Sequence, residues 1–294
     1  MNSKQIGVVL VAIGAVCFSA KAIIIKLAYR DYPVDAISLL SLRFGFSLPF
    51  FVLIALWQAK RGKMKFISIK EILWIGVLSI IGYYIASLFD FMGLKYLSAG
   101  LERIILFIYP TLVVIFSRLF LKKNISKNAI IALFITYLGI AIIGFTPQLF
   151  QSSNVVKGAI YVLISAVTYS LYLVFGGEII IKHGSINFNS ISLIFSSVFV
   201  LIHFGITSDI NLAALPNSTL AYGMALAIVS TVIPTFLLME GIRLLGANNG
   251  AIVASIGPVS TIILGYYFLG ETLSLQEMIG SAFVLIGVLM VGKK

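Results

Sequence analysis

Five ionisable side chains interrupt long apolar stretches in the first half of the chain: Lys21, Arg43, Asp90, Glu102 and Arg103. Inside a bilayer such a group costs at least ~2.5–3.5 kcal/mol on insertion scales, so each is by default a hypothesis for function. Three cations and two carboxylates could hold a charged solute, form a gate, or take up a proton at Asp90 or Glu102. The rival interpretation is that the cations reach toward the membrane surface and pair with nearby acids.

The depth of these residues favours one cluster. At ~1.5 Å rise per residue, all five lie within roughly 3–12 Å of the outer end of their predicted helices. Lys21 and Arg43 lie deepest, about five to seven residues from that end, and are the strongest functional candidates.

Aromatic, hydroxyl and proline residues occupy similar depths. The candidates for a cavity lining are Tyr83, Tyr84, Ser87, Tyr169, Tyr172, Ser230 and Thr231. Arg103, Phe107 and Pro110 follow at i, i+4 and i+7, on one face of a helix. Pro110 and Pro258 each remove a helical hydrogen bond and predict a hinge or cavity wall. Lipid packing for the aromatic rings, and a simple kink for each proline, remain the alternatives.

The sequence contains none of the usual catalytic or metal-binding patterns. It has no H-E-x-x-H, its two histidines are 20 residues apart, and it has a single cysteine, Cys17. It also has no Walker A motif, so ATP is not expected to act directly. We therefore predict no catalytic residue, no metal site and no cofactor, and the chain is not expected to be an enzyme.

Charged residues are rare in the chain as a whole. Of the 294 residues, 60% are hydrophobic and 11% are charged, whereas soluble proteins carry roughly 25% charged residues. This excludes a soluble domain and a disordered protein. Ten stretches are apolar enough, at about 20 residues, to span a bilayer. They run about 6–28, 36–58, 71–92, 100–120, 128–145, 158–178, 190–206, 219–239, 250–269 and 276–292.

Loop charges predict the orientation. The net charge is +11, which in a soluble protein would suggest nucleic acid. If the N-terminus is cytoplasmic, fourteen Lys and Arg residues fall in or beside inner loops, and four, Lys26, Arg30, Lys95 and Lys157, fall outside. Cytoplasmic loops are enriched in Lys and Arg, so we predict a multi-pass cell-membrane protein with both termini cytoplasmic and no nucleic-acid partner.

The chain also repeats itself. Phe120–Ser126 matches Phe268–Ser274, Gly93–Ala99 matches Gly241–Ala247, and Pro110 matches Pro258, always at an offset of 148 residues. Ala15–Ser19 matches Ala166–Ser170 at an offset of 151. We place the first repeat at 6–145 and the second at 158–292. Because each repeat has five helices, the second enters the membrane from the opposite side. Inverted repeats are typical of transporters that open alternately to the two faces.

At this level the chain resembles the drug/metabolite transporter superfamily, EamA type. The resemblance rests on residues 93–100, on Pro110 and Pro258, and on Leu269–Ser274 with Gly280 and Gly287. It implies ten helices in two EamA repeats around a central cavity, cytoplasmic termini, and export or import of metabolites and amino acids. The first repeat has Lys122-Lys123 where the second has Gly270-Glu271. We attribute this difference to the enrichment of Lys in cytoplasmic loops, because this turn is cytoplasmic in the first repeat and external in the second.

The sequence thus predicts an all-α membrane protein that transports a small metabolite, such as an amino acid or another carboxylate-bearing solute, by alternating access. Proton coupling is an option, and the chain could be a monomer or a homodimer. A channel or a structural membrane protein without a transport cycle is the alternative. The charges belong to one half only, since Asp90, Glu102 and Arg103 align with Leu238, Gly250 and Ala251, and Lys21 with Tyr172.

Overall fold

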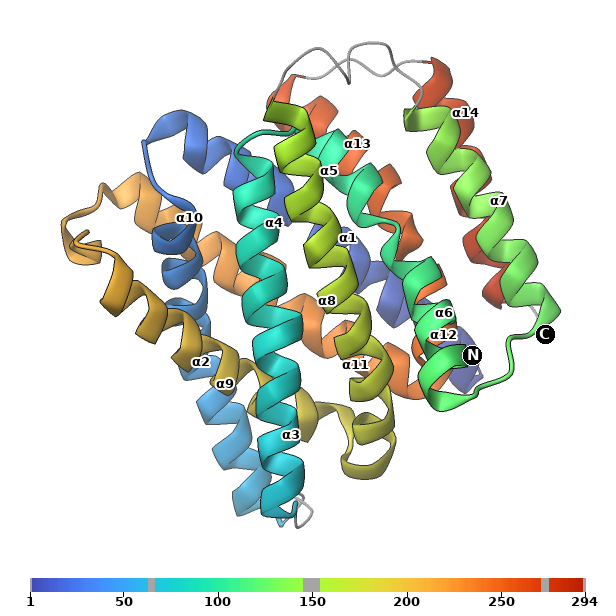
Figure 1. Ribbon diagram of the computed structural model, residues 1–294, viewed down its shortest axis with the longest axis horizontal. Coiled ribbons are helices and arrows are strands. Elements are labelled where there is room, and N and C mark those ends of the chain that lie inside the picture. Colours follow the sequence, from blue (N-terminus) through green and yellow to red (C-terminus); the bar gives the residue numbers. More distant parts are fainter. Residues whose placement is uncertain (1, 63–66, 145–153, 271–274, 293–294) are drawn as a thin grey trace.

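The computed structural model describes residues 2–62, 67–144, 154–270 and 275–292. Throughout these residues the regular structure is helical (Figure 1). Outside them lie Glu271–Ser274 of the sequence repeat and Lys63, Lys65, Lys293 and Lys294, four of the fourteen Lys and Arg residues assigned to inner loops. The elements are α1 Ser3–Asp31, α2 Ala36–Lys60, α3 Ile69–Ser79, η1 Ile80–Ile85, α4 Ala86–Leu94, α5 Ala99–Leu106, α6 Tyr109–Leu121, α7 Lys127–Gly144, α8 Asn154–His183, α9 Ser185–Thr207, η3 Leu212–Ala214, α10 Asn217–Ala227, η4 Ile228–Val232, α11 Ile233–Leu245, α12 Ala247–Val253, η5 Ala254–Ile256, α13 Gly257–Leu269 and α14 Leu275–Gly292.

Each predicted span falls on a helical segment, which confirms the predicted fold class. Eight segments in the described residues are long and apolar enough to cross a membrane, and α7 and α14 supply two shorter apolar helices. Observed helices exceed the predicted limits where polar residues continue the helix. The predicted span 158–178, for example, becomes Asn154–His183.

Side-chain caps define where several helices begin. Asn2 accepts a hydrogen bond from the backbone of Gln5, and Ser68 does the same for Glu71, in two capping boxes. Ser98 accepts from the backbone N–H of Leu101 at the start of α5. Such caps satisfy N–H groups that have no partner within the helix. The start of α5 is thereby fixed where it must place Glu102 and Arg103.

The two halves pack by equivalent contacts. A Cβ added to Gly93 would lie 2.5 Å from Val162 Cγ2, and one added to Gly241 would lie 2.3 Å from Val11 Cγ2. These glycines are 148 residues apart and the valines 151, the two offsets of the sequence repeat. The α1–α11 contact is therefore the counterpart of the α8–α4 contact, as an inverted repeat requires.

The helices α7 and α14 form a separate symmetric pair along one side of the bundle (Figure 1). A Cβ on Gly139 would lie 2.4 Å from the carbonyl oxygen of Gly280, and one on Gly287 would lie 2.8 Å from that of Ala132. Small residues allow such close backbone approach within membranes. This explains the in-step glycines of the two sequence repeats.

The turns after α6 and α13 also correspond. Lys122 and Gly270 are 148 residues apart, and both adopt a left-handed conformation, with φ of 53° and 70°. Glycine adopts this conformation without the steric cost that a Cβ brings. Lys122 is the one non-glycine residue with positive φ in the described part of the chain. The repeat therefore keeps the backbone shape of this turn while its side chain changes.

Candidate functional site

A cavity of about 80 Å³ lies at the centre of the bundle. Its lining combines charged, aromatic and small residues from both halves: Ala15, Phe18, Lys21, Arg43, Gly82, Tyr83, Ala86, Ser87, Asp90, Arg103, Leu106, Phe107, Tyr109, Ser165, Tyr169, Leu238, Ala254 and Gly257. The charged members all come from the first half, on α1, α2, α4 and α5. The cavity has room for a few water molecules in this conformation.

Four helices are broken at or next to this cavity: residues of three breaks line it, and Thr231 of the fourth bonds the lining residue Arg43. η1 and η4 are π-helical segments that begin 148 residues apart, at Ile80 and Ile228. The fourth and ninth predicted spans are each divided, between α5 and α6 and by η5 between α12 and α13. Pi-helical turns inside α-helices occur frequently at functional sites. The break positions are conserved between the halves although the side chains are not.

Two serines hold the broken helices at equivalent points. The Ser19 hydroxyl lies 2.9 Å from the carbonyl oxygens of both Ala15 and Gly257, and the Ser170 hydroxyl lies 2.6 Å from that of Ala166 and 3.2 Å from that of Tyr109. Pro110 and Pro258 follow Tyr109 and Gly257 and lie in the first turn of α6 and α13. Proline fits a first turn because its missing N–H would have no helical partner there. The prolines therefore begin new helices after the breaks.

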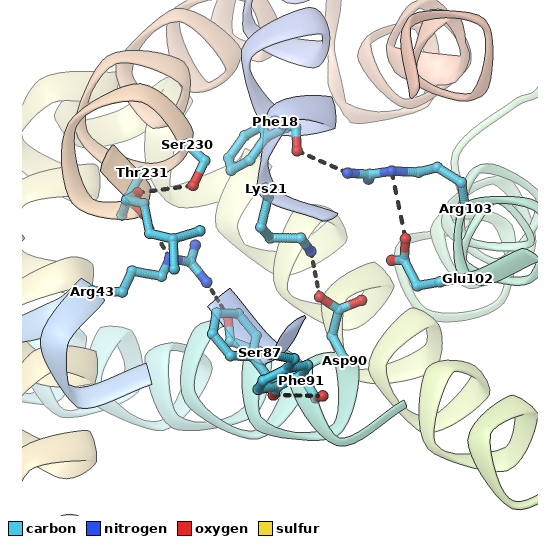
Figure 2. A network of polar contacts seen from close by, with 12 residues as sticks. Phe18, Lys21, Arg43, Ser87, Asp90, Phe91, Glu102, Arg103, Ser230 and Thr231 are labelled. Carbon is cyan, nitrogen blue, oxygen red and sulfur yellow. Dashed lines mark hydrogen bonds and ion pairs between the residues drawn. The ribbon is translucent and has the colours of Figure 1, made fainter. Parts of the chain in front are cut away.

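Lys21 and Asp90 form an ion pair beside the cavity. Lys21 Nζ on α1 lies 2.5 Å from Asp90 Oδ2 on α4 (Figure 2). The Asp90 side chain is 1% exposed and that of Lys21 is 11% exposed. Short charge-assisted hydrogen bonds of this kind offset part of the cost of burying both charges. The pair joins α1 to α4 beside the cavity.

Arg43 is buried without an acidic partner among the described residues. Its Nε donates to Thr231 Oγ1 at 2.6 Å, and its Nη1 donates to Ser87 Oγ at 3.2 Å (Figure 2). The guanidinium also lies 5.7 Å from the centre of the Phe91 ring. Two neutral hydroxyls orient the guanidinium, and no carboxylate of the described residues bonds it. The cavity beside it is therefore suited to an anionic group.

Arg103 and Glu102 form a weaker pair at the start of α5. Arg103 Nε lies 3.7 Å from Glu102 Oε2, while Arg103 Nη2 donates to the carbonyl oxygen of Phe18 at 2.8 Å (Figure 2). The Glu102 side chain is completely buried. Arg103 thus connects α5 to α1. Glu102 lies next to Arg103 and is not part of the cavity lining.

Tyrosine rings form one wall of the cavity. Tyr169 packs edge-on against Tyr83 and Tyr109, with ring centres 6.4 and 5.5 Å apart. Behind them Tyr172 contacts Tyr83 at 4.9 Å and accepts a hydrogen bond on its hydroxyl from Ser192. The Tyr83 hydroxyl is buried and has no hydrogen-bond partner in the described residues. The wall is therefore aromatic, and the Tyr83 hydroxyl is a polar group in it without a hydrogen-bond partner among the described residues.

The structure places the sequence candidates in three groups. Lys21, Arg43, Asp90, Arg103, Phe107 and Tyr169 line the cavity. Glu102, Tyr172 and Thr231 contact lining residues from behind. Tyr84, Pro110 and Pro258 are not part of the lining. The Tyr84 hydroxyl instead hydrogen-bonds His203 Nδ1 at 2.9 Å, on the side facing α9.

The predicted common face of Arg103, Phe107 and Pro110 is wrong at its last residue. α5 ends at Leu106 and α6 begins at Tyr109, so the helical periodicity is interrupted before Pro110. Tyr109 takes a lining position that the sequence analysis did not assign. Its place immediately before Pro110 is the available signal, because proline has no N–H with which to continue the hydrogen bonds of α5.

Comparisons with known proteins agree with this architecture. A family model described as "EamA-like transporter family" matches residues 5–145 and 156–293. The chain is 33% identical to the "Uncharacterized transporter YcbK" of Bacillus subtilis, over 98% of this chain and 95% of the relative. It is 24% identical to an "Uncharacterized transporter" of Archaeoglobus fulgidus, over 89% of this chain and 90% of the relative. A solved crystal structure matches with a TM-score of 0.74 and 15% identity, over 96% and 94% of the two chains, which shows the shared fold.

Proposed function

The chain belongs to the EamA-like transporter family and is a membrane transporter, and we propose that it moves a small carboxylate-bearing solute across the cytoplasmic membrane as a secondary transporter. The observation that carries this proposal is Arg43, a guanidinium that is 2% exposed, lines the central cavity and bonds two hydroxyls. A carboxylate entering the cavity would supply the anionic partner that the described residues do not.

The lining supports a solute with an apolar part. Phe18, Leu106, Phe107 and Leu238 contribute apolar surface beside the charged side chains. Small-molecule sites are usually mostly apolar, with a few polar groups that fix orientation. The carboxylate would face Arg43, and the rest of the solute would contact the aromatic wall and the second half of the chain.

Inverted symmetry supports alternating access as the mechanism. We assign the two repeats to residues 6–145 and 158–292, with the cavity between them and both termini in the cytoplasm. The equivalent Ser19–Gly257 and Ser170–Tyr109 contacts lie at the helix breaks of the two repeats, and they support equivalent movements of the two repeats in turn. In an alternating-access cycle, a rearrangement of one repeat opens the cavity to one face of the membrane. The equivalent rearrangement of the other repeat opens it to the other face.

Counterflow into proteoliposomes tests the proposal directly. Vesicles are loaded with unlabelled L-phenylalanine, L-alanine, L-glutamate or succinate, and uptake of the labelled compound is compared with that of glycerol and putrescine. At least one carboxylate is expected to exchange faster than in protein-free vesicles. Exchange of glycerol or putrescine alone would contradict the carboxylate assignment. Flux without acceleration by the internal solute would indicate a channel, and no flux of any compound would favour a structural protein.

A further inference from the structure

Glu102 is the carboxylate that the proposed binding site does not use. Its side chain is 0% exposed, and neither carboxylate oxygen accepts a hydrogen bond from an N–H or O–H group of the described residues, while the Asp90 carboxylate lies within hydrogen-bond reach of it. A buried ionised carboxylate without hydrogen bonds is costly, and protonation removes most of that cost. The 3.7 Å separation from Arg103 Nε is too long for a hydrogen bond.

Three charged groups lie around Glu102. Lys21 approaches from α1, Asp90 from α4, and Arg103 from α5 itself (Figure 2). Among the other helices packed on α5, α13 contains no charged residue. α7 contributes Tyr137, whose hydroxyl donates to the carbonyl oxygen of Phe107, and α8 contributes Tyr169.

Lys157 on α8 takes no part in this group. Its ammonium lies 5.1 Å from the centre of the Tyr96 ring and 6.0 Å from that of Tyr161. The positive charges nearest to the Glu102 carboxylate are therefore those of Lys21 and Arg103. Both cations have better partners: Lys21 bonds Asp90, and Arg103 bonds the Phe18 carbonyl.

We infer that Glu102 binds one proton in each transport cycle and that the proton and the carboxylate-bearing solute cross the membrane together. A proton from water on the open side forms an O–H bond with one Glu102 oxygen, and the same proton leaves to water on the other side. This inference rests on the proposed function, because the carboxylate is what the proton accompanies.

The sign of the coupling follows from the charges at the site. Lys21, Arg43 and Arg103 face Asp90 and Glu102, so the site carries one excess positive charge when both acids are ionised. Protonation of Glu102 leaves two excess positive charges, which attract a carboxylate more strongly. By linkage, a bound carboxylate strengthens proton binding by the same factor. Cooperative binding of both leads to movement in the same direction.

Asp90 is the less suitable proton carrier. Its Oδ2 bonds Lys21 Nζ at 2.5 Å, an interaction that is strongest when the carboxylate is ionised. Protonating Asp90 would weaken the one hydrogen bond that the described residues give to Lys21. The geometry therefore assigns Asp90 to holding Lys21 and Glu102 to the proton.

Infrared difference spectroscopy tests Glu102 without any solute. The purified wild-type protein is compared between acidic and alkaline pH, and the carbonyl stretch of a protonated buried carboxyl group is recorded. This band is expected to disappear in Glu102→Gln, to shift in Glu102→Asp, and to persist in the control Glu178→Gln, whose side chain is 44% exposed. A band that persists in Glu102→Gln, or is absent from the wild type, overturns the assignment. Glu102→Asp decides the matter if Glu102→Gln does not fold.

Transport tests the coupling separately. Proteoliposomes that are alkaline inside are expected to accumulate whichever of L-phenylalanine, L-alanine, L-glutamate or succinate shows counterflow. Glu102→Gln should lower the accumulation ratio at least tenfold more than it lowers the counterflow rate, while Glu178→Gln should leave both at the wild-type value. Wild-type accumulation that ignores the pH gradient, or full accumulation in Glu102→Gln, would overturn the inference and leave the proposed function intact. Absence of counterflow for every carboxylate would instead contradict the proposed function, with the infrared result still deciding the protonation of Glu102.

Discussion

The Lys21–Asp90 ion pair has no counterpart in the second half of the chain, although the helices that carry it do. The equivalent positions are Tyr172 and Leu238, and both side chains are buried. The packing of α1 on α11 and of α8 on α4 is nevertheless the same. The fold therefore does not need this ion pair. Because the pair occurs in one half only, we propose that it serves what the cavity binds.

Removing one member of this pair should destabilise the protein more than removing both. Lys21→Ala leaves the Asp90 charge buried and unpaired, as Asp90→Ala leaves that of Lys21, and each should cost about 3–5 kcal/mol. The double variant removes both charges and should recover much of that loss. Thermal unfolding in detergent measures stability, and counterflow should be lost in all three variants.

A matched comparison uses the exposed pair Lys123–Glu178, whose side chains are 40% and 44% exposed. Lys123→Ala should change stability by about 0–1 kcal/mol, because solvent screens exposed pairs. Wild-type counterflow in Lys21→Ala would show that the pair is structural only, whatever its effect on unfolding.

Arg43 should contribute to binding through both its charge and its shape. Arg43→Ala should weaken apparent affinity for the carboxylate about 10- to 100-fold, since a hydrogen bond to a charged group is worth about 1.5–3 kcal/mol. Arg43→Lys keeps the charge but loses the planar fork and should fall between. Competition by unlabelled carboxylate in the counterflow assay measures the change.

The control for Arg43 is Arg61→Ala. Arg61 is exposed, follows α2 and lies 4.0 Å over the Trp57 ring, away from the cavity. It should leave apparent affinity unchanged. Equal losses in Arg43→Ala and Arg61→Ala would mean that general positive charge, and not a specific contact, attracts the solute.

Much of the fold could be predicted because hydropathy and the repeat offsets report on backbone packing. Gly139 and Gly287 match in sequence since each must admit the facing helix at the same depth. The π-helical segments at Ile80 and Ile228 were not predicted. An i→i+5 turn leaves no periodic apolar signal over five or six residues, so hydropathy treats the span as continuous.

That limit also explains what sequence reasoning missed in the cavity. Depth along α-helices indicated that Lys21, Asp90 and Arg103 lie at similar levels, and the structure brings them around one cavity. Tyr83 and Tyr84 lie at the same depth, so only the face of the helix on which each side chain lies distinguishes them. Both lie inside η1, where the extra residue per turn changes which side chain faces inward. Tyr83 lines the cavity and Tyr84 faces His203.

Exchange of these two tyrosines for phenylalanine should separate their roles. Tyr83→Phe removes a cavity hydroxyl with no other described partner and should alter apparent affinity or solute preference in counterflow. Tyr84→Phe removes a hydrogen bond to His203, which should cost about 0.5–1.5 kcal/mol of stability and leave transport unchanged. The reverse pattern would place the solute on the α9 side of η1.

Close packing of α7 on α14 predicts a strong effect at Gly139. A Cβ there would lie 2.4 Å from the Gly280 carbonyl and 2.8 Å from the Val284 nitrogen, so Gly139→Val must separate the helices. Overpacking of this kind typically costs about 1–3 kcal/mol. Gly205→Val is the control, because a Cβ on Gly205 meets nothing within 4 Å. Equal unfolding temperatures for the two variants would contradict the observed approach of the helices.

Orientation can be checked with single cysteines, because Cys17 is the one native cysteine. In a Cys17→Ser background, Arg61→Cys should react with an impermeant maleimide only after cells are opened, whereas Asp209→Cys should react in intact cells. Both positions are exposed at the ends of helices, so the difference reports on the side of the membrane. The physical basis is the excess of Lys and Arg in the loops assigned to the cytoplasm. Labelling of Arg61→Cys but not of Asp209→Cys in intact cells would invert the assignment, and with it the face toward which the Lys21–Asp90 pair lies.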